Sequence, residues 1–204
     1  MTLTIRQQFG DIDIYLFDQL LKGRIARGMR VLDAGCGHGR NLVFLLREGI
    51  EVFGVDPDPQ AVEAVRDLAK TLAPMLPTEN FRVEHIEAMT LPDRTMDVVI
   101  CSAVLHFARD AAHFEAMVRR MWQTLVPGGL LFCRLATSTG IESQVVPRGS
   151  GRYLLPDGSE RYLVTAGQLI ELTASLDGTL IEPIKSTIVH DMRCMATWVA
   201  RAAG

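Results

Sequence analysis

The sequence predicts an α/β fold in which helices cover both faces of a mostly parallel, doubly wound β-sheet. Strand-like and helix-like segments alternate along most of the 204 residues, which is the order that parallel strands and crossover helices require. Residues 98–101 form a short, wholly apolar run, as expected for a central strand covered on both faces. A glycine-rich turn at 31–40 joins an apolar run to a helix. The length fits one domain, so we expect 1–204 to form a single unit.

Apolar spacing, glycine and proline define the expected elements of the N-terminal half. Apolar residues at helical intervals mark the helices, Gly49 ends the second of them, and Pro57 suits the first position of the third. In chain order, the expected elements are a helix at 12–21 after Gly10, a strand at 31–32, a helix at 41–47, a strand at 52–55, a helix from Pro57 to the break at 74–77, and a strand at 81–86.

The C-terminal half continues the alternation with one exception. Asp110 can cap a helix with apolar residues at helical spacing up to 125, and the Pro-Gly-Gly at 127–129 ends it. Residues 137–163 fit no simple element, so this segment is either a functional loop or contains structure that the pattern does not reveal. The other expected elements are the strand at 98–101, a strand at 130–135, a helix at 166–176 and strand-like runs near 179–189 and 195–201.

Charge and composition disfavour several classes of protein. The 21 basic and 24 acidic residues leave a net charge of −3, which provides no global field to hold nucleic acid. The N-terminus lacks the layout of a signal peptide, and no apolar run approaches the ~18 residues of a membrane span. The four cysteines are dispersed with no C-x-x-C pair, so neither a metal site nor a disulfide framework is expected. These features favour a cytoplasmic enzyme and leave its oligomeric state open.

The turn VLDAGCGHGR carries the strongest functional signal. Asp33 ends the strand, and glycines follow at alternate positions, Gly35, Gly37 and Gly39. Glycine tolerates positive φ and lets a ligand lie against bare backbone, so we expect these N–H groups to face a ligand at the helix N-terminus. A dinucleotide fingerprint would place its third glycine at position 40, which is Arg40, so a nicotinamide oxidoreductase is disfavoured.

Acidic residues follow the next two strands at the edge where open α/β sheets bind ligands. Asp56 offers two acceptor oxygens and no donor, which suits both hydroxyls of a ribose; the alternative is a helix N-cap. Glu87 can accept from the amino group of adenine while the Ala88 N–H donates to the ring; the alternative is an ordinary surface acid. After the fourth strand, Cys101 and Ser102 can offer backbone carbonyls.

Five segments together resemble a class I S-adenosylmethionine (SAM) dependent methyltransferase of the small-molecule branch, which includes tellurite-resistance-type and generic methyltransferase-domain proteins. They are VLDAGCGHGR, EVFGVD, EAMTLPD, MDVVICSAVLHF and LVPGGLLFCRL, over roughly residues 30–135. The resemblance implies a Rossmann-like sheet of seven strands with the last one antiparallel. It also implies SAM as the methyl donor and S-adenosylhomocysteine (SAH) as the product. Glu87 departs from the family, which more often has aspartate there.

The resemblance also divides the chain and assigns cofactor contacts. Residues 1–29 would form an N-terminal helix or lid, 30–135 the cofactor-binding core, and 136–204 a substrate-side insertion with the C-terminal strands. The implied cofactor contacts are Asp33, Ala34, Gly35, Cys36, Gly37, Gly39, Asn41, Asp56, Pro57, Glu87, Ala88, Cys101 and Ser102.

The reaction follows from the donor. A sulfonium methyl is already electrophilic, so alignment of the acceptor dominates, and a general base is needed only for a protonated acceptor. His106 is the candidate base, with simple packing as the alternative. The N-terminal segment with Arg6, Gln7, Phe9 and Tyr15 is expected to fold over the site, and 137–163 to form the other wall of the acceptor pocket. Candidate acceptor contacts, suited to an anionic small molecule, are Arg134, Arg152, Tyr153, Tyr162, His190 and Arg193.

The acceptor class follows from motifs that the sequence lacks. The fourth strand leads into SAVLHF rather than the Asn/Asp-Pro-Pro-aromatic run of amine-directed nucleic-acid methyltransferases, and no Pro-Cys dipeptide of cytosine C5 enzymes occurs. A small-molecule acceptor is therefore favoured over nucleic acid or a membrane. Two alternatives stay open: a protein methyltransferase, and a catalytically silent SAM-binding module that acts as a sensor or partner subunit.

Overall fold

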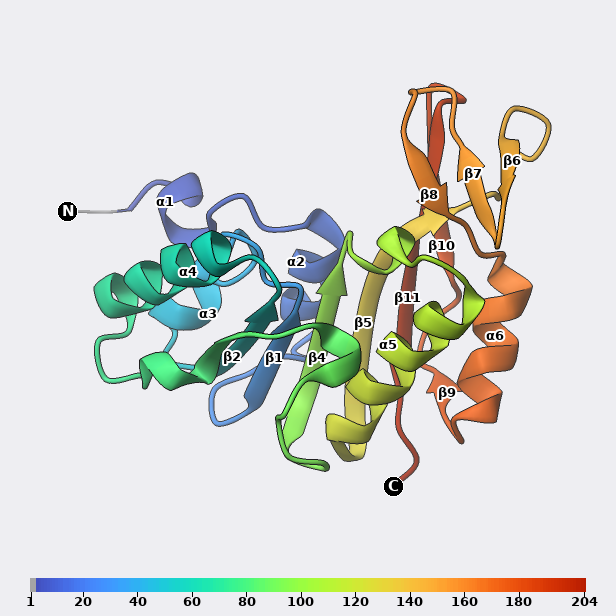
Figure 1. Cartoon of the computed structure of the whole chain (residues 1–204). Coiled ribbons are helices and arrows are strands. Elements are labelled where there is room, and N and C mark those ends of the chain that lie inside the picture. The colour runs from blue at the N-terminus through green and yellow to red at the C-terminus, as the bar shows by residue number, and fades with distance from the viewer. Residues whose placement is uncertain (1–2) are drawn as a thin grey trace.

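A computed structural model describes residues 3–204, and its central feature is the expected doubly wound α/β sheet (Figure 1). The strands lie in the order β10-β11-β5-β4-β1-β2-β3, and β9 pairs with the C-terminal end of β11. Strands β1 to β5 run parallel to one another, whereas β11 is antiparallel to both β5 and β10. The strands are β1 Arg30–Ala34, β2 Glu51–Asp56, β3 Phe81–Val83, β4 Met96–Ser102, β5 Leu125–Thr137, β9 Thr179–Leu180, β10 Lys185–Val189 and β11 Arg193–Arg201.

Helices cover both faces of this sheet. Val98 and Ile100 of β4 pack with α2, α3 and α4, whereas Val99 and Cys101 of the same strand pack with α5 and α6 on the opposite face. This period of two explains why a central strand reads as a continuous apolar run. The helices are α1 Ile5–Phe9, α2 Ile14–Leu21, α3 Val43–Arg47, α4 Pro59–Leu72, α5 Ala111–Thr124 and α6 Ala166–Ser175, with the 3-10 turns η1 Thr78–Asn80, η2 Ile86–Ala88 and η3 Leu105–Phe107.

The helix starts depend on side-chain caps. Asp110 caps α5 as predicted, because its carboxylate accepts from the His113 N–H at 2.8 Å. The prediction for α4 is wrong by two residues: Asp58 is the N-cap and Pro59, not Pro57, occupies the first turn. The carboxylate of Asp56 therefore does not cap the helix and stays at the end of β2.

The third strand is shorter than predicted. Expected over 81–86, it ends at Val83 because β2, its only neighbour in the described sheet, ends at Asp56. The Glu84 N–H still donates to the Asp56 carbonyl at 3.2 Å, and the chain then turns into η2. The acid at 87 therefore lies on a 3-10 turn above the sheet.

Residues 137–163 contain strands rather than one long loop. They form a separate three-stranded sheet, β6 Val146–Gly149, β7 Arg152–Leu154 and β8 Glu160–Tyr162, here called the small sheet. It rises with the β10–β11 turn above the carboxyl edge of the main sheet (Figure 1). These strands pair with one another and are antiparallel. Because each has only three or four residues, they produce no recognisable alternation in the sequence.

Two further differences concern the C-terminal half. The run expected near 179–189 is split into β9 and β10, with Pro183 between them, and β5 begins at Leu125 and continues through Pro127 to Thr137. Within residues 3–204, no helix is long and apolar enough to cross a membrane.

Candidate functional site

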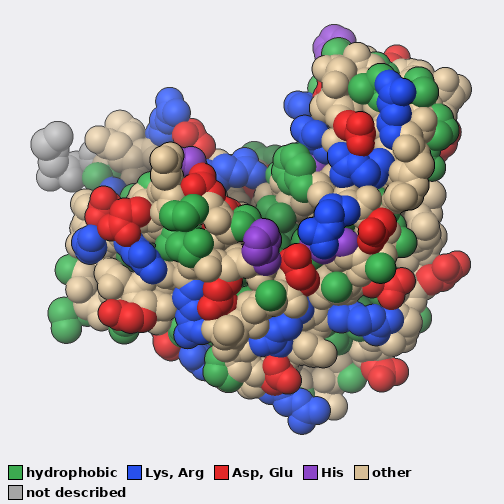
Figure 2. Space-filling view, in the orientation of Figure 1, with side chains coloured by type: hydrophobic (Ala, Val, Ile, Leu, Met, Phe, Trp, Pro, Cys, Tyr) green, Lys and Arg blue, Asp and Glu red, His purple; other side chains and the backbone are tan. Residues whose placement is uncertain are grey.

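A cavity of about 740 Å³, here called the cleft, opens at the carboxyl ends of β1, β2 and β4. In Figure 2 the surface is hollowed between the side that carries α4 and the raised small sheet. This is the sheet edge beside the reversal of strand order between β1 and β4, where open α/β sheets bind ligands. The lining residues are Gly35, Cys36, Gly37, His38, Arg40, Asn41, Asp56, Pro57, His85, Ile86, Glu87, Ser102, Ala103, Val104, Phe107, His113 and Met117.

The glycine turn shapes the cleft because its glycines have no side chains, and its backbone N–H groups contribute less because they are already hydrogen-bonded. The Gly35 N–H donates to the Val55 carbonyl, the Gly37 N–H to the Asp56 carboxylate and the Gly39 N–H to the Cys36 carbonyl, so the three glycine N–H groups expected to face a ligand are already paired within the chain. A Cβ on Gly35 would lie 2.4 Å from Val104, because the turn packs directly on the segment after β4. A Cβ on Gly37 would enter open space, and that glycine has φ +50°. The turn is thus closed at Gly35 and open at Gly37.

Asp33 lies beneath this turn with its charge uncompensated. Its side chain is 1% exposed, and neither carboxylate oxygen finds a hydrogen-bond donor among residues 3–204. Burial raises the pKa of Asp33 to about 7, the nearby Asp56 charge adds to the rise, and Arg40 opposes it. A buried carboxylate in this state favours a cationic group nearby, so the site fits the ammonium end of an amino acid.

Asp56 stands at the rim between β2 and the cleft. One carboxylate oxygen accepts from the Gly37 N–H at 2.9 Å and the other from the Asp58 N–H at 3.0 Å. These two bonds fix the carboxylate and leave one lone pair on each oxygen. Asp56 can therefore still accept two hydroxyl groups, which is the pairing that a ribose offers.

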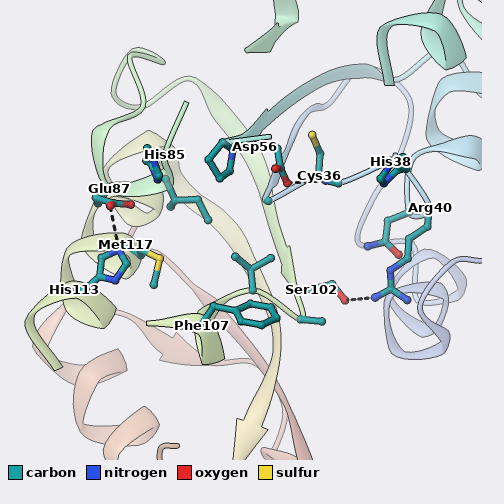
Figure 3. A pocket seen from close by; sticks show the side chains of 17 residues that line it. Cys36, His38, Arg40, Asp56, His85, Glu87, Ser102, Phe107, His113 and Met117 are labelled. Atoms are coloured by element: carbon teal, nitrogen blue, oxygen red, sulfur yellow. Dashed lines mark hydrogen bonds and ion pairs between the residues drawn. The ribbon is translucent and has the colours of Figure 1, made fainter. Parts of the chain in front are cut away.

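Glu87 and His113 face each other on the opposite wall (Figure 3). The Nε2 atom of His113 lies 3.0 Å from Oε1 of Glu87, and both side chains line the cleft. Burial acts to raise the pKa of Glu87, but its own backbone N–H and His113 together bring that pKa below its ordinary value. Glu87 is thus a carboxylate that accepts hydrogen bonds.

His106 lies outside the cleft and lacks the features of a general base. Its ring is buried, and Nδ1 accepts from the Ala136 N–H at 3.3 Å. Burial, with the Arg161 charge, lowers the pKa of His106 to about 4, so the ring is neutral near pH 7. A neutral imidazole bears one N–H, which must then be on Nε2. Its only free lone pair is already used, so the geometry contradicts the predicted role and supports the packing alternative.

A polar cluster joins the N-terminal segment to the strand ends. The Asp13 carboxylate accepts from Tyr15 N–H as the cap of α2 and lies 3.1 Å from Nε of Arg134. Ser102 Oγ is 3.4 Å from the same carboxylate, and the Arg40 guanidinium is 3.9 Å away. The Asp13 N–H donates to Asn41 Oδ1 at 3.0 Å. Three residues that line the cleft are thus tied to the start of α2.

The N-terminal segment flanks the cleft without lining it. Phe9 stacks on Phe44 of α3 at 4.8 Å, and Tyr15 lies beneath the Arg134 guanidinium with its hydroxyl 2.6 Å from Thr187. Arg6 and Gln7 are exposed on α1. The placement of these residues as a cover over the cofactor stays a prediction.

The candidate acceptor contacts do not gather at the cleft. Arg134 pairs with Asp13, Arg152 with Glu160 and the Ala108 carbonyl, and Tyr162 is buried on Phe114. Tyr153 packs beside Leu155 and Leu163 within the small sheet, while His190 and Arg193 lie at the exposed β10–β11 turn. The small sheet does reach the rim, because the Arg161 guanidinium lies 4.8 Å above the ring of Phe107.

Several predicted cofactor contacts are also set back from the cleft. Asp33, Ala34 and Cys101 are buried in the sheet, Gly39 packs on Leu68, and Ala88 is exposed on η2 outside the cleft lining. The residues that lie at the cleft as predicted are Gly35, Cys36, Gly37, Asn41, Asp56, Pro57, Glu87 and Ser102. Those that sequence reasoning missed are His38, Arg40, His85, Ile86, Ala103, Val104, Phe107, His113 and Met117. Many of these adjoin predicted contacts along the chain, whereas His113 and Met117 reach the cleft from α5, which no motif marked.

Comparisons with known proteins relate the first part of the chain to a family of known description. Residues 31–129 match a family described as "Methyltransferase domain". A ubiquinone biosynthesis O-methyltransferase of Methylocella silvestris is 34% identical over 116 residues, which are 57% of this chain and 43% of that protein. A human mitochondrial protein of the same name is 28% identical over 156 residues, 67% of this chain and 41% of the relative. The matches therefore span less than half of these curated relatives.

Solved structures share the whole fold at low sequence identity. A SAM-dependent methyltransferase of Methanosarcina mazei superimposes with a TM-score of 0.72 at 18% identity, covering 90% of this chain and 97% of that one. A Burkholderia thailandensis 1,6-didemethyltoxoflavin-N1-methyltransferase, solved with its substrate and SAH, gives 0.69 at 19% identity over 93% and 76% of the two chains. Residues 31–129 therefore carry a methyltransferase domain, and the sheet around them has the fold of SAM-dependent methyltransferases of known structure.

Proposed function

We propose that this protein transfers a methyl group from SAM to a small-molecule acceptor by in-line displacement and releases SAH. The observation that carries the proposal is the placement of two carboxylates on the wall of one cleft and of a third, buried one behind its glycine turn. Asp33 lies below the glycine turn, Asp56 follows β2, and Glu87 follows β3. Each suits a different donor group: an ammonium, a ribose diol and an adenine amino group.

The cavity also has the size and wall chemistry of such a site. Its volume of about 740 Å³ falls within the range of small-molecule sites, roughly 300–1,000 Å³. Ile86, Val104, Phe107 and Met117 give the Glu87 end an apolar wall that suits a flat ring. Gly37 leaves open space where a side chain would otherwise fill the cleft.

The chemistry asks little of this chain beyond binding and alignment. SAM, when bound, supplies a methyl group that is already electrophilic. The residues of the cleft hold the donor, and alignment of two reactants can lower a barrier by roughly 7–11 kcal/mol in ideal cases. His106 cannot accept the acceptor's proton in its observed hydrogen-bonded state. We therefore propose that transfer proceeds without His106 as a base.

The acceptor class rests on composition and relatives. A net charge of −3 disfavours a nucleic-acid acceptor, and the named relatives act in ubiquinone biosynthesis. The four cysteines are free and buried, which agrees with a reducing compartment such as the cytoplasm. We extend the proposal to a single functional unit over 1–204 that acts there on a small molecule.

Calorimetric titration with SAM and SAH tests the donor. Asp56→Ala is expected to weaken binding by on the order of 1.5–3 kcal/mol for each lost charge-assisted hydrogen bond. Asp58→Ala is the matched control: it removes the α4 cap, which costs about 1 kcal/mol of stability, and leaves affinity unchanged. Unaltered affinity in Asp56→Ala, or binding of NAD(H) in place of SAM and SAH, would contradict the proposal.

Methyl transfer itself needs a second experiment. Labelled SAM is offered with thiols, metalloid oxyanions, carboxylates, phenols and, separately, proteins. Transfer to a small molecule supports the proposal. Transfer to proteins alone makes this a protein methyltransferase, and binding of SAM without transfer to any class supports the silent module.

A further inference from the structure

The Glu87–His113 pair joins a predicted residue of the cleft to one that no sequence motif marked. Glu87 lies on η2 and His113 on the first turn of α5, 26 residues apart. Their side chains are 22% and 13% exposed, so the contact is sheltered from solvent. Both residues border the apolar end of the cleft, beside Met117 (Figure 3).

The hydrogen bonds of His113 determine which of its nitrogens carries a proton. Nδ1 accepts from the Arg109 N–H at 3.2 Å, so this nitrogen bears no hydrogen. The single N–H of the neutral ring is therefore on Nε2, and it donates to Oε1 of Glu87 at 3.0 Å. Asp110 holds the backbone of His113 through the helix cap. The imidazole is thus fixed at both ends and aims one donor at the carboxylate.

A carboxylate fixed in this way discriminates between purine rings. One oxygen of Glu87 is occupied by His113, and the other can accept a hydrogen bond from a ligand. An amino group at the purine 6-position donates to it, whereas a 6-oxo group presents a second acceptor and is repelled. We propose that His113 is a positioning residue that holds Glu87 so that the cleft selects 6-amino over 6-oxo purine nucleosides.

This inference rests on the proposed function, because it assumes that the nucleoside end of SAM or SAH occupies this end of the cleft. His113 need not touch the cofactor. It acts by restricting the Glu87 side chain, which otherwise could turn its carboxylate toward solvent and accept from water instead.

Titration of the full chain with SAH and with its deaminated analogue, S-inosylhomocysteine, tests the role. The wild type is expected to prefer SAH by roughly ten- to a hundredfold, the value of one hydrogen bond to a charged group. His113→Ala should reduce this preference to within about threefold, mainly by weakening SAH. His113→Gln retains an N–H donor of similar reach and should restore it. Glu87→Gln should also abolish the preference, because an amide can donate to a 6-oxo group.

Two controls separate positioning from a structural effect. Glu84→Gln changes an acid three residues away whose oxygens bind Thr90, and it should keep the wild-type preference. Nitrogen-15 spectra of the wild type should show His113 as the Nε2–H tautomer, and Glu87→Gln should shift that Nε2 signal.

The outcomes distinguish the two proposals. If the wild type binds neither compound, the proposed function fails. If it binds SAH and His113→Ala either keeps the wild-type preference or weakens both ligands equally, the positioning role is overturned while the proposed function stands. A wild type that binds both ligands equally also overturns it.

Discussion

Removal of the Asp13 carboxylate is expected to destabilise the protein far more than removal of an exposed carboxylate from the same segment. Asp13 is 8% exposed and lies 3.1 Å from Arg134, whose side chain is 16% exposed. Asp13→Ala leaves that largely buried guanidinium without its anion, which typically costs about 3–5 kcal/mol. The lost cap of α2 contributes about 1 kcal/mol, and Arg40, which is half-exposed, adds little. The expected loss is therefore about 4–6 kcal/mol.

Urea unfolding, followed by the fluorescence of buried Trp198, measures this loss. Asp11→Ala is the matched control, because its pairing with Arg6 joins side chains that are 70% and 81% exposed, and such pairs are worth about 0–1 kcal/mol. Asp13→Asn keeps an acceptor for the cap and isolates the charge. If Asp13→Ala costs no more than Asp11→Ala, the polar cluster does not hold the N-terminal segment in place.

The remaining predictions concern Asp33 and the glycine turn. Burial raises the pKa of Asp33 to about 7, above an unfolded value of about 3.9, so its contribution to stability is present at low pH and lost as pH rises from about 4 to 7. For one proton, the free energy of unfolding falls by at most about 1.4 kcal/mol per pH unit. Asp33→Asn should flatten this decline when urea unfolding is measured at pH 5 and at pH 8. If the variant and the wild type lose the same stability between these two pH values, the raised pKa is contradicted. Gly37→Ala should fold with a loss of about 1–2 kcal/mol from its positive φ but lose affinity for SAH, because its methyl group enters the cleft. Gly35→Ala should add about 1–3 kcal/mol of clash with Val104, so equal thermal stability of the two variants would argue against the described packing.

Local signals make the side of the cleft beside the glycine turn predictable. The glycine turn, the Asp110 cap and the acid after each of two strands depend on residues that are close in sequence, and they lie where expected. Pairings between distant residues give no such signal. Asp13 meets Arg134 only because α2 packs beside the end of β5, and Glu87 meets His113 only because η2 lies against the start of α5.

The errors also have physical causes. His106 has the residue type of a base and follows the fourth strand in the sequence, but its role depends on which nitrogen is already bonded, and that is set by the backbone of Ala136 thirty residues away. The small sheet resembles a loop in the sequence because β7 and β8 have three residues each, too few to show a period of two.

The small sheet has a consequence for how such a protein can diverge. Its strands pair with one another, and the bridge between Thr137 and Val164 that joins this region to the end of β5 lies just after β8, outside the small sheet. Insertions, deletions or exchanges within 146–162 therefore leave the register of β5 against β11 intact. Arg161 nevertheless places this segment over Phe107 at the rim of the cleft. Substitutions there can thus change one wall of the rim while the residues at the carboxyl ends of β1 and β2 stay under their own, separate constraint.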